Sequence, residues 1–477
     1  MDHQHPPLKL HFIPYLAPGH LIPLCSIATL FAARGHHVTV IITPSYAQIL
    51  RKSSPSLHLH VVEFPARESG FPEGVELMSA ATNLEDAGKF HYATTLLRVP
   101  ISRFLEQHPP DCIVADFFYP WVHDVANNLR IPSLAFNGFS LFTVAAMESV
   151  RSNPALDSNG GPFVIPDFPH HISLCSRPPK RATAFMERLL ETEMKSDGLI
   201  VNSFAELDGV EYIQHYEKGT GHKAWHLGPG CLAAKMGEER GEKSVVSEKS
   251  VVSEKEFVSW LNSKQPKSVV YVCFGSMCRF PDKQLYEMAC GLEEAAHDFV
   301  WVVPEKKGKE DESEEEKEKW LPKGFEERNA EKGLIIRGWA PQLLILGHTA
   351  IGAFLTHCGW NSTLEAVTAG VPMLTWPVVG DQFYNERLVT ELRGVGLEVG
   401  ATEWKVMGYG EREKLVTSHC IQKAVRRLMD GGDEAQEIRR RAQEFADKAK
   451  QSLRDGGSSH NNLTALIAHL TRLRDAR

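Results

Sequence analysis

The stretch that decides the fold is Trp339–Gln382, which reads WAPQLLILGHTAIGAFLTHCGWNSTLEAVTAGVPMLTWPVVGDQ. Its centre is a short apolar run, Ala353–Thr356, followed by a turn and by helix-forming residues that continue to Gly370. A buried strand that leads through a tight turn into a helix is the repeating unit of parallel α/β sheets. The stretch therefore predicts an α/β fold, in which ligands lie beyond the carboxyl ends of the strands.

The turn in this stretch favours an anion. Gly359 permits close approach of the backbone, while Asn361 and Ser362 can cap the helix or donate hydrogen bonds. Unpaired amides at the helix N-terminus then point at whatever lies above the strand end, most simply a phosphate. His357 adds a donor there, and Glu365, one turn later, can accept hydrogen bonds from the two hydroxyls of a ribose.

Each residue taken singly also has a purely structural explanation. Trp339 fits a core position, His357 a satisfied histidine and Glu365 a charge on a helix surface. Trp339 also offers a flat face on which a base can stack. Together these residues supply partners for a base, a ribose and a phosphate within one strand–helix unit, which predicts a nucleotide-binding site.

Further strand–helix units lie outside this stretch, on the N-terminal side. Leu10–Pro14 and Val38–Thr43 are predicted strands on either side of a helix at Leu21–Ala33. Cys112–Asp116 (CIVAD) and Leu199–Asn202 are short β-type runs, and each ends in a polar residue. This pattern predicts a first α/β half with polar side chains at its strand ends.

A second series begins after a repetitive segment, Glu242–Ser259, which reads EKSVVS, EKSVVS, EKEFVS. A period of six fits neither helix nor strand, so a linker is expected. Strands at Val269–Phe274 and Phe299–Val303 and a helix around Leu285–Ala296 follow. We therefore predict an N-terminal domain at 1–240, a linker at 241–259, a C-terminal domain at 260–455 and a C-terminal helix at 456–477 that packs back on the N-terminal domain.

Composition narrows the class of protein. The 477 residues are 43% hydrophobic and 23% charged, as in ordinary globular proteins of more than one domain. The net charge of −8 argues against nucleic acid as a partner. The nine cysteines include no CxxC pair, which fits a reducing compartment. Neither a P-loop nor a GxGxxG motif after a strand occurs, which disfavours an ATP P-loop protein and a nicotinamide enzyme. Prolines interrupt the most membrane-like run, Leu10–Ala33, so this run is not expected to span a membrane.

The stretch resembles the signature box of plant UDP-sugar-dependent glycosyltransferases of small molecules, whose pattern is WAPQ…H…F…HCGWNS…E…G.P…P…DQ. The resemblance extends to Phe274-Gly275-Ser276, to LPKGFEER at Leu321–Arg328 and to PGH at Pro18–His20. The charged loop before Trp320 and the GWAPQ motif look most like a subgroup that acts on flavonoids, other phenolics and triterpenoid or steroid aglycones.

The resemblance implies two facing Rossmann-like domains (GT-B type) with a cleft between them, the acceptor in the N-lobe and the donor in the C-lobe. For the nucleoside, it implies that Trp339 stacks on uracil, that Ala340 and Gln342 border the base and the ribose, and that Glu365 holds the ribose hydroxyls. The diphosphate would be held by Ser276, His357, Asn361 and Ser362, with Gly359 and Trp360 in the same turn. The sugar hydroxyls would be bound by Asp381 and Gln382.

The predicted catalytic pair is His20 and Asp116. His20 follows Pro18-Gly19 after the first predicted strand, in a loop before the helix, and Asp116 closes the strand CIVAD. A histidine can take a proton at neutral pH. The resemblance makes His20 the base and Asp116 its orienter, as in a triad whose serine is replaced by an acceptor hydroxyl. Without the donor box His20 would read as an ordinary loop histidine.

The expected reaction is direct displacement with inversion, in which a sugar passes from a UDP-sugar to a hydroxyl of an apolar plant metabolite. No metal or other cofactor is expected, because the donors of the turn replace a cation. Open alternatives are a UDP-xylose user that extends a sugar chain on a saponin, and a non-catalytic nucleotide-sugar-binding protein. Among enzymes the nearest rival is an animal-type glucuronosyltransferase. That alternative is disfavoured, because such an enzyme is expected to have a signal peptide and a C-terminal membrane helix, and the sequence shows the pattern of neither. A cytoplasmic monomer is expected.

The sugar and the acceptor are less sharply indicated. Trp360 stands where users of UDP-glucuronic acid often place an arginine, and Gln382 resembles the pattern of glucose users, so glucose is expected first. A group of aromatic residues suits a flat apolar acceptor, although core packing explains them equally well. They are Phe117, Phe118, Tyr119, Trp121, Phe136, Phe139 and Phe142.

Overall fold

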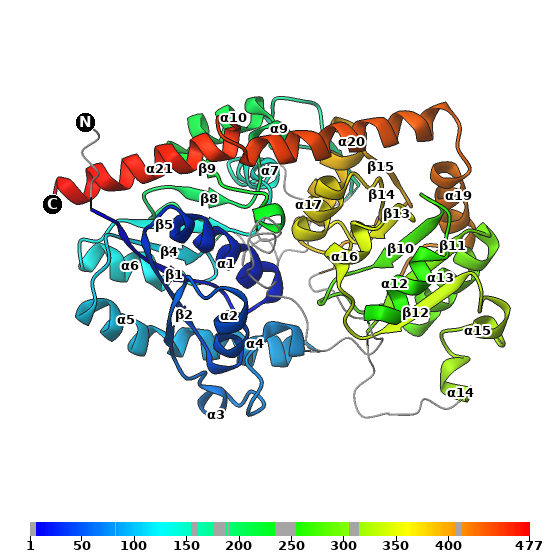
Figure 1. Cartoon of the computed structure of the whole chain (residues 1–477), viewed down its shortest axis with the longest axis horizontal. Coiled ribbons are helices and arrows are strands. Elements are labelled where there is room, and N and C mark those ends of the chain that lie inside the picture. Colours follow the sequence, from blue (N-terminus) through cyan, green and yellow to red (C-terminus); the bar gives the residue numbers. More distant parts are fainter. Residues whose placement is uncertain are drawn as a thin grey trace.

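The fold is seen in a computed structural model, which describes residues 6–81, 83–153, 161–175, 187, 190–191, 193–233, 254–304, 314–405 and 413–477. Two separate parallel sheets form two lobes, which lie side by side in Figure 1, the N-terminal lobe on the left and the C-terminal lobe on the right.

The N-terminal lobe is built on a seven-stranded parallel sheet with the order β3-β2-β1-β4-β5-β8-β9. Because β1 and β4 are neighbours and Ile13 pairs with Ala115, the segments that follow them start from one edge of the sheet. Its strands are β1 (Lys9–Ile13), β2 (His37–Ile42), β3 (His58–Val61), β4 (Cys112–Asp116), β5 (Ser133–Asn137), β8 (Leu199–Val201) and β9 (Ala224–His226).

The C-terminal lobe is built on a six-stranded parallel sheet with the order β12-β11-β10-β13-β14-β15. Every residue of β10 and β13 is buried, as expected for strands covered on both faces. Thr356 pairs with Cys273, so the predicted residues Ser276 and His357 follow adjacent strand ends. The strands are β10 (Val269–Cys273), β11 (Asp298–Val303), β12 (Gly333–Arg337), β13 (Ile351–Thr356), β14 (Met373–Thr375) and β15 (Gly396–Glu398).

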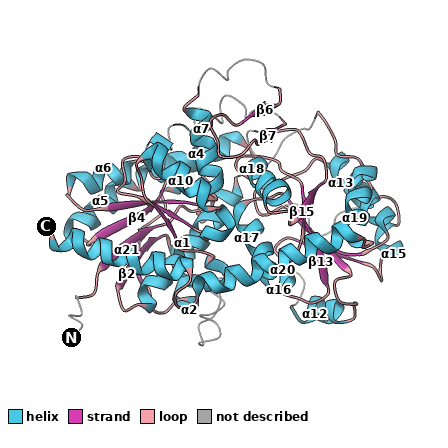
Figure 2. Cartoon of the chain, turned by 90° about the horizontal axis from the view of Figure 1, so that it is seen from above, coloured by secondary structure: helices cyan, strands magenta, loops and turns pink. Residues whose placement is uncertain are grey.

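Helices pack around both sheets (Figures 1 and 2). In the N-terminal lobe they are α1 (Pro18–Ala33), α2 (Pro44–Ser53), α3 (Ala66–Ser69), α4 (Leu84–Leu96), α5 (Arg98–Gln107), α6 (Trp121–Asn128), α7 (Leu141–Arg151), α9 (Ala205–Asp208) and α10 (Val210–Thr220), with a 3₁₀ turn at Met78–Ala80 and a small hairpin of β6 (Phe163–Val164) and β7 (Ser173–Leu174). In the C-terminal lobe they are α12 (Glu254–Asn262), α13 (Asp282–Ala295), α14 (Glu314–Lys317), α15 (Phe325–Arg328), α16 (Gln342–Leu346), α17 (Trp360–Ala369), α18 (Gln382–Arg387) and α19 (Ser418–Met429), with a π-helical turn at Leu388–Leu392.

Two helices at the end of the chain join the lobes. In Figure 1, α20 (Asp433–Leu453) runs along the C-terminal lobe and α21 (Ser458–Asp475) continues over the N-terminal lobe. Ala442, Phe445 and Ala449 of α20 are buried in a hydrophobic cluster that contains residues of both lobes. Leu463, Leu466 and Leu470 of α21 are buried in the N-terminal core. The apolar faces of α20 and α21 therefore attach one end of the chain to both lobes.

Two predicted boundaries differ from the structure. Residues 241–253 of the predicted linker lie outside the described residues. The last six residues of the predicted linker belong to α12, because Phe257 and Leu261, which are four positions apart, bury one face of this helix. His20 lies in the first turn of α1 and not in a loop, since Pro18 occupies the first helical turn, where proline is favoured.

Candidate functional site

The predicted catalytic pair is in contact. Nδ1 of His20 lies 2.9 Å from Oδ2 of Asp116, the last residue of β4. Asp116 is fully buried, and its other oxygen, Oδ1, accepts a 3.1 Å hydrogen bond from the backbone N–H of Phe118. Since a carboxylate only accepts hydrogen bonds, Nδ1 of His20 carries the proton and Nε2 is left with a lone pair. The pair can thus act as a base with its orienter.

The ring of His20 is backed by the loop between β5 and α7. A Cβ placed on Gly138 would lie 3.0 Å from Nδ1 and Cε1 of His20, closer than real Cβ atoms normally approach. Only a residue without a side chain lets the backbone pass so close to the imidazole. Gly138 therefore leaves room for the imidazole ring, and the side chain of His20 is 15% exposed.

Aromatic rings surround His20 within the N-terminal lobe. The ring of Phe118 stands edge-on to His20, with centroids 4.9 Å apart, and stacks on Tyr15 at 4.7 Å. Among the seven aromatic residues proposed from the sequence, Phe118 and Phe139 are partly exposed, and the others belong to the core. The core explanation thus applies to five of them, and Phe118 offers an apolar face beside the base.

His357 lies at the opposite lobe's strand end, directly after β13. Burial lowers the pKa of His357 to about 4, so its imidazole is neutral at physiological pH. Its Nδ1 is buried and has no hydrogen-bond partner among the described residues. Gly359 passes so close to the ring that any Cβ there would collide with Nε2. A neutral imidazole at this point can donate one hydrogen bond and accept another, through its two ring nitrogens.

A hydrogen-bonded trio lies beside α17. The side-chain amide of Gln342 donates to Oε2 of Glu365 at 2.6 Å and to Oγ of Ser362 at 3.0 Å. Burial raises the pKa of the Glu365 carboxyl to about 7, and the bond from Gln342 partly offsets this effect. The trio consists of three residues that the sequence analysis expected to bind the base, the ribose and the phosphate of the nucleotide. Oε1 of Glu365 is left as a further hydrogen-bond acceptor.

Asp381 and Gln382 lie at the start of α18 and are nearly buried, with exposed fractions of 8% and 6%. Burial raises the pKa of the Asp381 carboxyl to about 7. Hydrogen bonds to the carboxylate, including one from Asn385, and the attraction to His20 lower this pKa and partly offset the effect of burial. Oε1 of Gln382 accepts from the backbone N–H groups of Val378 and Val379. Its amide NH₂ is therefore the group that remains for a ligand.

Two residues assigned to the donor also form hydrogen bonds between the lobes. The indole N–H of Trp360 donates 2.8 Å to the carbonyl of Asn202, and the amide of Asn361 donates 2.6 Å to the carbonyl of Gly19. Trp360 is only 3% exposed. The sequence did not predict these cross-lobe contacts, which place the first turn of α17 directly beside the residue that precedes His20.

The remaining predicted donor residues lie in loops of the C-terminal lobe. The side chain of Trp339 is 37% exposed and Ala340 is buried just before α16, while Ser276 is partly buried after β10. An exposed indole fits the stacking face expected of Trp339. The hydrogen bonds thus bring Gln342, Ser362 and Glu365 together, and the bond from Asn361 to Gly19 places the first turn of α17 next to His20.

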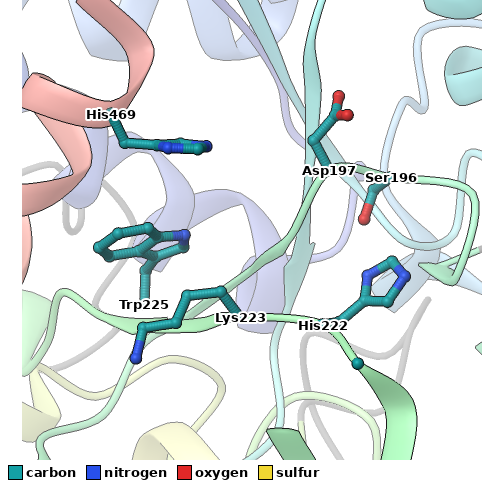
Figure 3. Close-up of a pocket in the computed structure, with 7 residues that line it drawn as sticks. Ser196, Asp197, His222, Lys223, Trp225 and His469 are labelled. Atoms are coloured by element: carbon teal, nitrogen blue, oxygen red, sulfur yellow. The ribbon is translucent and has the colours of Figure 1, made fainter. Parts of the chain in front are cut away.

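A separate pocket of about 460 Å³ lies at the edge of the N-terminal sheet, between β9 and α21 (Figure 3). It contains none of the predicted site residues, so we place the chemistry where the lobes meet. The pocket is lined by Ser196, Asp197, Gly221, His222, Lys223, Trp225 and His469.

Comparisons with known proteins agree with this geometry. The family described as UDP-glucoronosyl and UDP-glucosyl transferase matches residues 243–408. UDP-glucosyl transferase 73CC6 of Saponaria officinalis is 45% identical, with 98% of each chain covered. UDP-glucose flavonoid 3-O-glucosyltransferase 7 of Fragaria ananassa is 45% identical over 98% of this chain and 96% of its own. The chain belongs to the plant family 1 UDP-glycosyltransferases.

A solved structure supports the fold of this glycosyltransferase. Glycyrrhiza uralensis UGT73P12, complexed with glycyrrhetinic acid 3-O-monoglucuronide, is 36% identical and has a TM-score of 0.86, with 98% of this chain and 96% of that chain covered. The predicted GT-B fold is confirmed, and so is the prediction of an enzyme that transfers a sugar from a UDP-sugar to a small molecule. The alternative of a non-catalytic binding protein is set aside. Among the described residues, no helix combines the length and apolarity needed to cross a membrane.

The sequence did not single out three polar or backbone groups of the glycosyltransferase site. They are Gly138 behind His20, the Asn202 carbonyl beneath Trp360, and Asn385, whose amide donates 2.7 Å to Oδ2 of Asp381. A signal existed only for Asn385, because residues four apart on a helix lie on the same face. The other two depend on how distant segments pack.

The raised pKa of Glu365 leads to a pH-dependent prediction. A carboxyl whose pKa is higher in the folded than in the unfolded protein stabilises the fold at low pH, and this contribution is lost as pH rises through about 7. We expect Glu365→Gln to stabilise the ligand-free glycosyltransferase by up to about 3 kcal/mol at pH 8, since burial raises the pKa from 4.5 to about 7 and one pKa unit corresponds to about 1.4 kcal/mol. Thermal melts of both proteins between pH 5.5 and pH 8 measure the difference.

The stabilisation should shrink toward pH 5.5, where Glu365 is protonated in the folded protein. UDP affinity of the same variant should fall, because a neutral amide accepts hydroxyl bonds less well than a carboxylate. A stability difference independent of pH, with unchanged UDP affinity, would show that Glu365 is neither strained by burial nor part of the donor site.

Proposed function

We propose that this glycosyltransferase transfers glucose from UDP-glucose to a hydroxyl of a flat or polycyclic apolar plant metabolite, a flavonoid or other phenolic or a triterpenoid sapogenin. The observation that carries the proposal is the 2.9 Å contact between His20 and the buried carboxylate of Asp116, beside the donor residues of the other lobe.

In the proposed mechanism, Nε2 of His20 takes the proton of the acceptor hydroxyl while the hydroxyl oxygen attacks the anomeric carbon of the sugar. The bond from that carbon to the UDP oxygen breaks, and the configuration inverts. Asp116 holds Nδ1–H toward itself and stabilises the positive charge that develops on the imidazole. General base catalysis of this kind supplies about 10²–10⁴-fold in rate.

We propose that UDP leaves toward the first turn of α17. Backbone N–H groups at a helix N-terminus, the hydroxyl of Ser362 and the neutral imidazole of His357 are the groups that would stabilise the diphosphate. Ser276 would add a hydroxyl from the loop after β10, and Asn361 would have to exchange its bond to Gly19 for one to phosphate. The protein's own donors make a metal unnecessary in this proposal.

The acceptor class is supported by chemistry on the N-terminal side. The partly exposed ring of Phe118 is an apolar aromatic surface next to His20. It stacks on the buried ring of Tyr15, whose hydroxyl is bonded to His91 at 2.9 Å. Such a surface favours flat ring systems with few polar groups. The names of relatives point the same way, since they mention a flavonoid in one case and glycyrrhetinic acid 3-O-monoglucuronide in another.

The donor sugar is proposed from Asp381 and Gln382. The carboxylate of Asp381 and the free NH₂ of Gln382 can hold neighbouring hydroxyls of a neutral hexose, while no cation in the signature box is set to pair with a sugar carboxylate. UDP-xylose, which lacks the hydroxymethyl group, keeps many of these contacts and is the competitor. We further propose that the enzyme acts as a cytoplasmic monomer, because its cysteine pattern fits a reducing compartment and one chain supplies both lobes.

The experiment is a competition among four donors on one accepted aglycone, chosen from a panel of flavonoids, coumarins and triterpenoids. We expect the highest kcat/KM with UDP-glucose, ahead of UDP-xylose, UDP-galactose and UDP-glucuronic acid, because losing a buried hydrogen bond costs about 1–3 kcal/mol. Preference for glucuronic acid would contradict the inference from Trp360, and preference for galactose that from Gln382. Excess EDTA should leave the rate unchanged, and a loss restored by Mg²⁺ would refute the metal-free mechanism.

A further inference from the structure

Asn385 lies at the centre of the contact between the lobes. It is fully buried on α18, and its side-chain amide uses all of its hydrogen-bonding capacity. Nδ2 donates to Oδ2 of Asp381 at 2.7 Å and to the carbonyl of Cys358 at 2.9 Å. Oδ1 accepts from the hydroxyls of Thr143 at 2.9 Å and Ser140 at 3.1 Å. An amide with two donors and two acceptor positions in use has only one orientation that satisfies all partners.

These four partners belong to different parts of the enzyme. Asp381 and Cys358 belong to the donor side, and Cys358 precedes the turn into α17 with a positive φ of 62°. Ser140 caps α7 of the N-terminal lobe, and Thr143 lies in its first turn. The loop that leads into this cap contains Gly138, which contacts the ring of His20. Asn385 therefore connects the carboxylate of Asp381 with the wall behind His20.

The two ends of the Asn385 amide serve different lobes. Both Nδ2 protons of Asn385 are bonded to groups of the C-terminal lobe, and Oδ1 is bonded to hydroxyls of the N-terminal lobe. If the bonds to either lobe were lost, a buried polar group would be left unpaired. The single proton of Ser140 serves either Asn385 or Thr143 at one time, since Ser140 Oγ also lies 2.9 Å from Thr143 Oγ1. Thr143 is thus the steadier link across the lobes.

We propose that Asn385 is a positioning residue that fixes the Asp381 carboxylate for the sugar of the donor while holding it in register with the N-terminal lobe. The inference rests on the proposed role of Asp381 toward sugar hydroxyls. Asn385 acts through Asp381 and does not itself contact the substrate. Its effect is therefore largest on the sugar half of the donor, and UDP senses it only through the bond from Asn385 to the carbonyl of Cys358.

The test compares affinities for UDP and UDP-glucose by calorimetry, together with kcat and KM, in the full-length enzyme. Asn385→Ala should lower kcat/KM for UDP-glucose by about 10–100-fold, as expected for losing oriented buried hydrogen bonds. UDP affinity should stay within a few fold of wild type. Thr143→Val keeps the shape and the bonds to Asp381 but removes the cross-lobe donor, so it should shift kcat/KM in the same direction by a smaller factor.

A matched control is Thr390→Val, which removes a comparable hydroxyl bond to the carbonyl of Glu386 in the turn after α18 without touching the other lobe. Its kinetics should equal those of wild type. Equal losses of UDP and UDP-glucose affinity in Asn385→Ala would reduce Asn385 to a structural residue. If Asn385→Ala does not fold, Thr143→Val decides, and wild-type kinetics in that variant would overturn the proposal. The wild-type donor preference tests the proposed function separately, and the donor that it selects replaces UDP-glucose in these assays.

Discussion

His20→Ala is expected to lower kcat by about 10²–10⁴-fold, the usual contribution of a positioned general base. In the neutral imidazole of His20, Nε2 has a lone pair that can take a proton, because the Nδ1 proton is held by Asp116 at 2.9 Å. Binding of UDP should stay near that of wild type, since the proposed nucleotide contacts come from the other lobe. Steady-state kinetics with UDP-glucose and calorimetry with UDP measure the two quantities.

A control histidine makes the comparison specific. His469 of α21 is also partly buried against an aromatic ring, with its centroid 5.9 Å from that of Trp225, but it lies at the separate pocket of Figure 3. His469→Ala should leave kcat unchanged. If His20→Ala loses UDP binding and turnover by similar factors in a folded protein, His20 is a structural link between the lobes and not the base.

Much of the fold can be predicted from the sequence because parallel strands are short, fully apolar runs. Cys112–Asp116 is a strand with the predicted bounds, and the predicted strands at Val269–Phe274 and Phe299–Val303 differ from β10 and β11 by one residue. The donor region is predictable for a related reason. Half of its predicted residues lie within one strand–turn–helix unit, β13 to α17, so that local geometry alone brings that half together.

The parts that sequence reasoning did not find depend on the placement of one lobe against the other. Asn361 reads as a phosphate ligand from its place in the turn, yet its amide is bonded to the carbonyl of Gly19, which is 342 positions away in the chain. Gly138 gives no local signal either, because its role exists only through the ring of His20. Contacts of such large sequence separation follow from packing and not from periodicity.

Asp116 is the second residue for which a large effect is expected, and its two oxygens explain why. Oδ2 accepts from Nδ1–H of His20, and Oδ1 accepts from the backbone N–H of Phe118. An asparagine has the same shape but only one acceptor oxygen. If that oxygen keeps the bond to Phe118, the NH₂ group faces Nδ1 and favours the tautomer in which Nε2 carries the proton. The base then has no lone pair directed at the acceptor hydroxyl.

We therefore expect Asp116→Asn to lower kcat by up to about 10⁴-fold, the loss seen when the same change gives the wrong tautomer in a Ser-His-Asp triad. Fold and UDP affinity should be retained, since the substitution changes no volume and the nucleotide contacts lie in the other lobe. Asp197→Asn is a matched control, because Asp197 also accepts a backbone N–H, from Ser133 at 2.8 Å, but away from His20. Kinetics, UDP calorimetry and thermal melts of both variants decide the matter. A kcat within a few fold of wild type in Asp116→Asn would leave Asp116 as a structural cap of the turn after β4, and His20 would need no orienter.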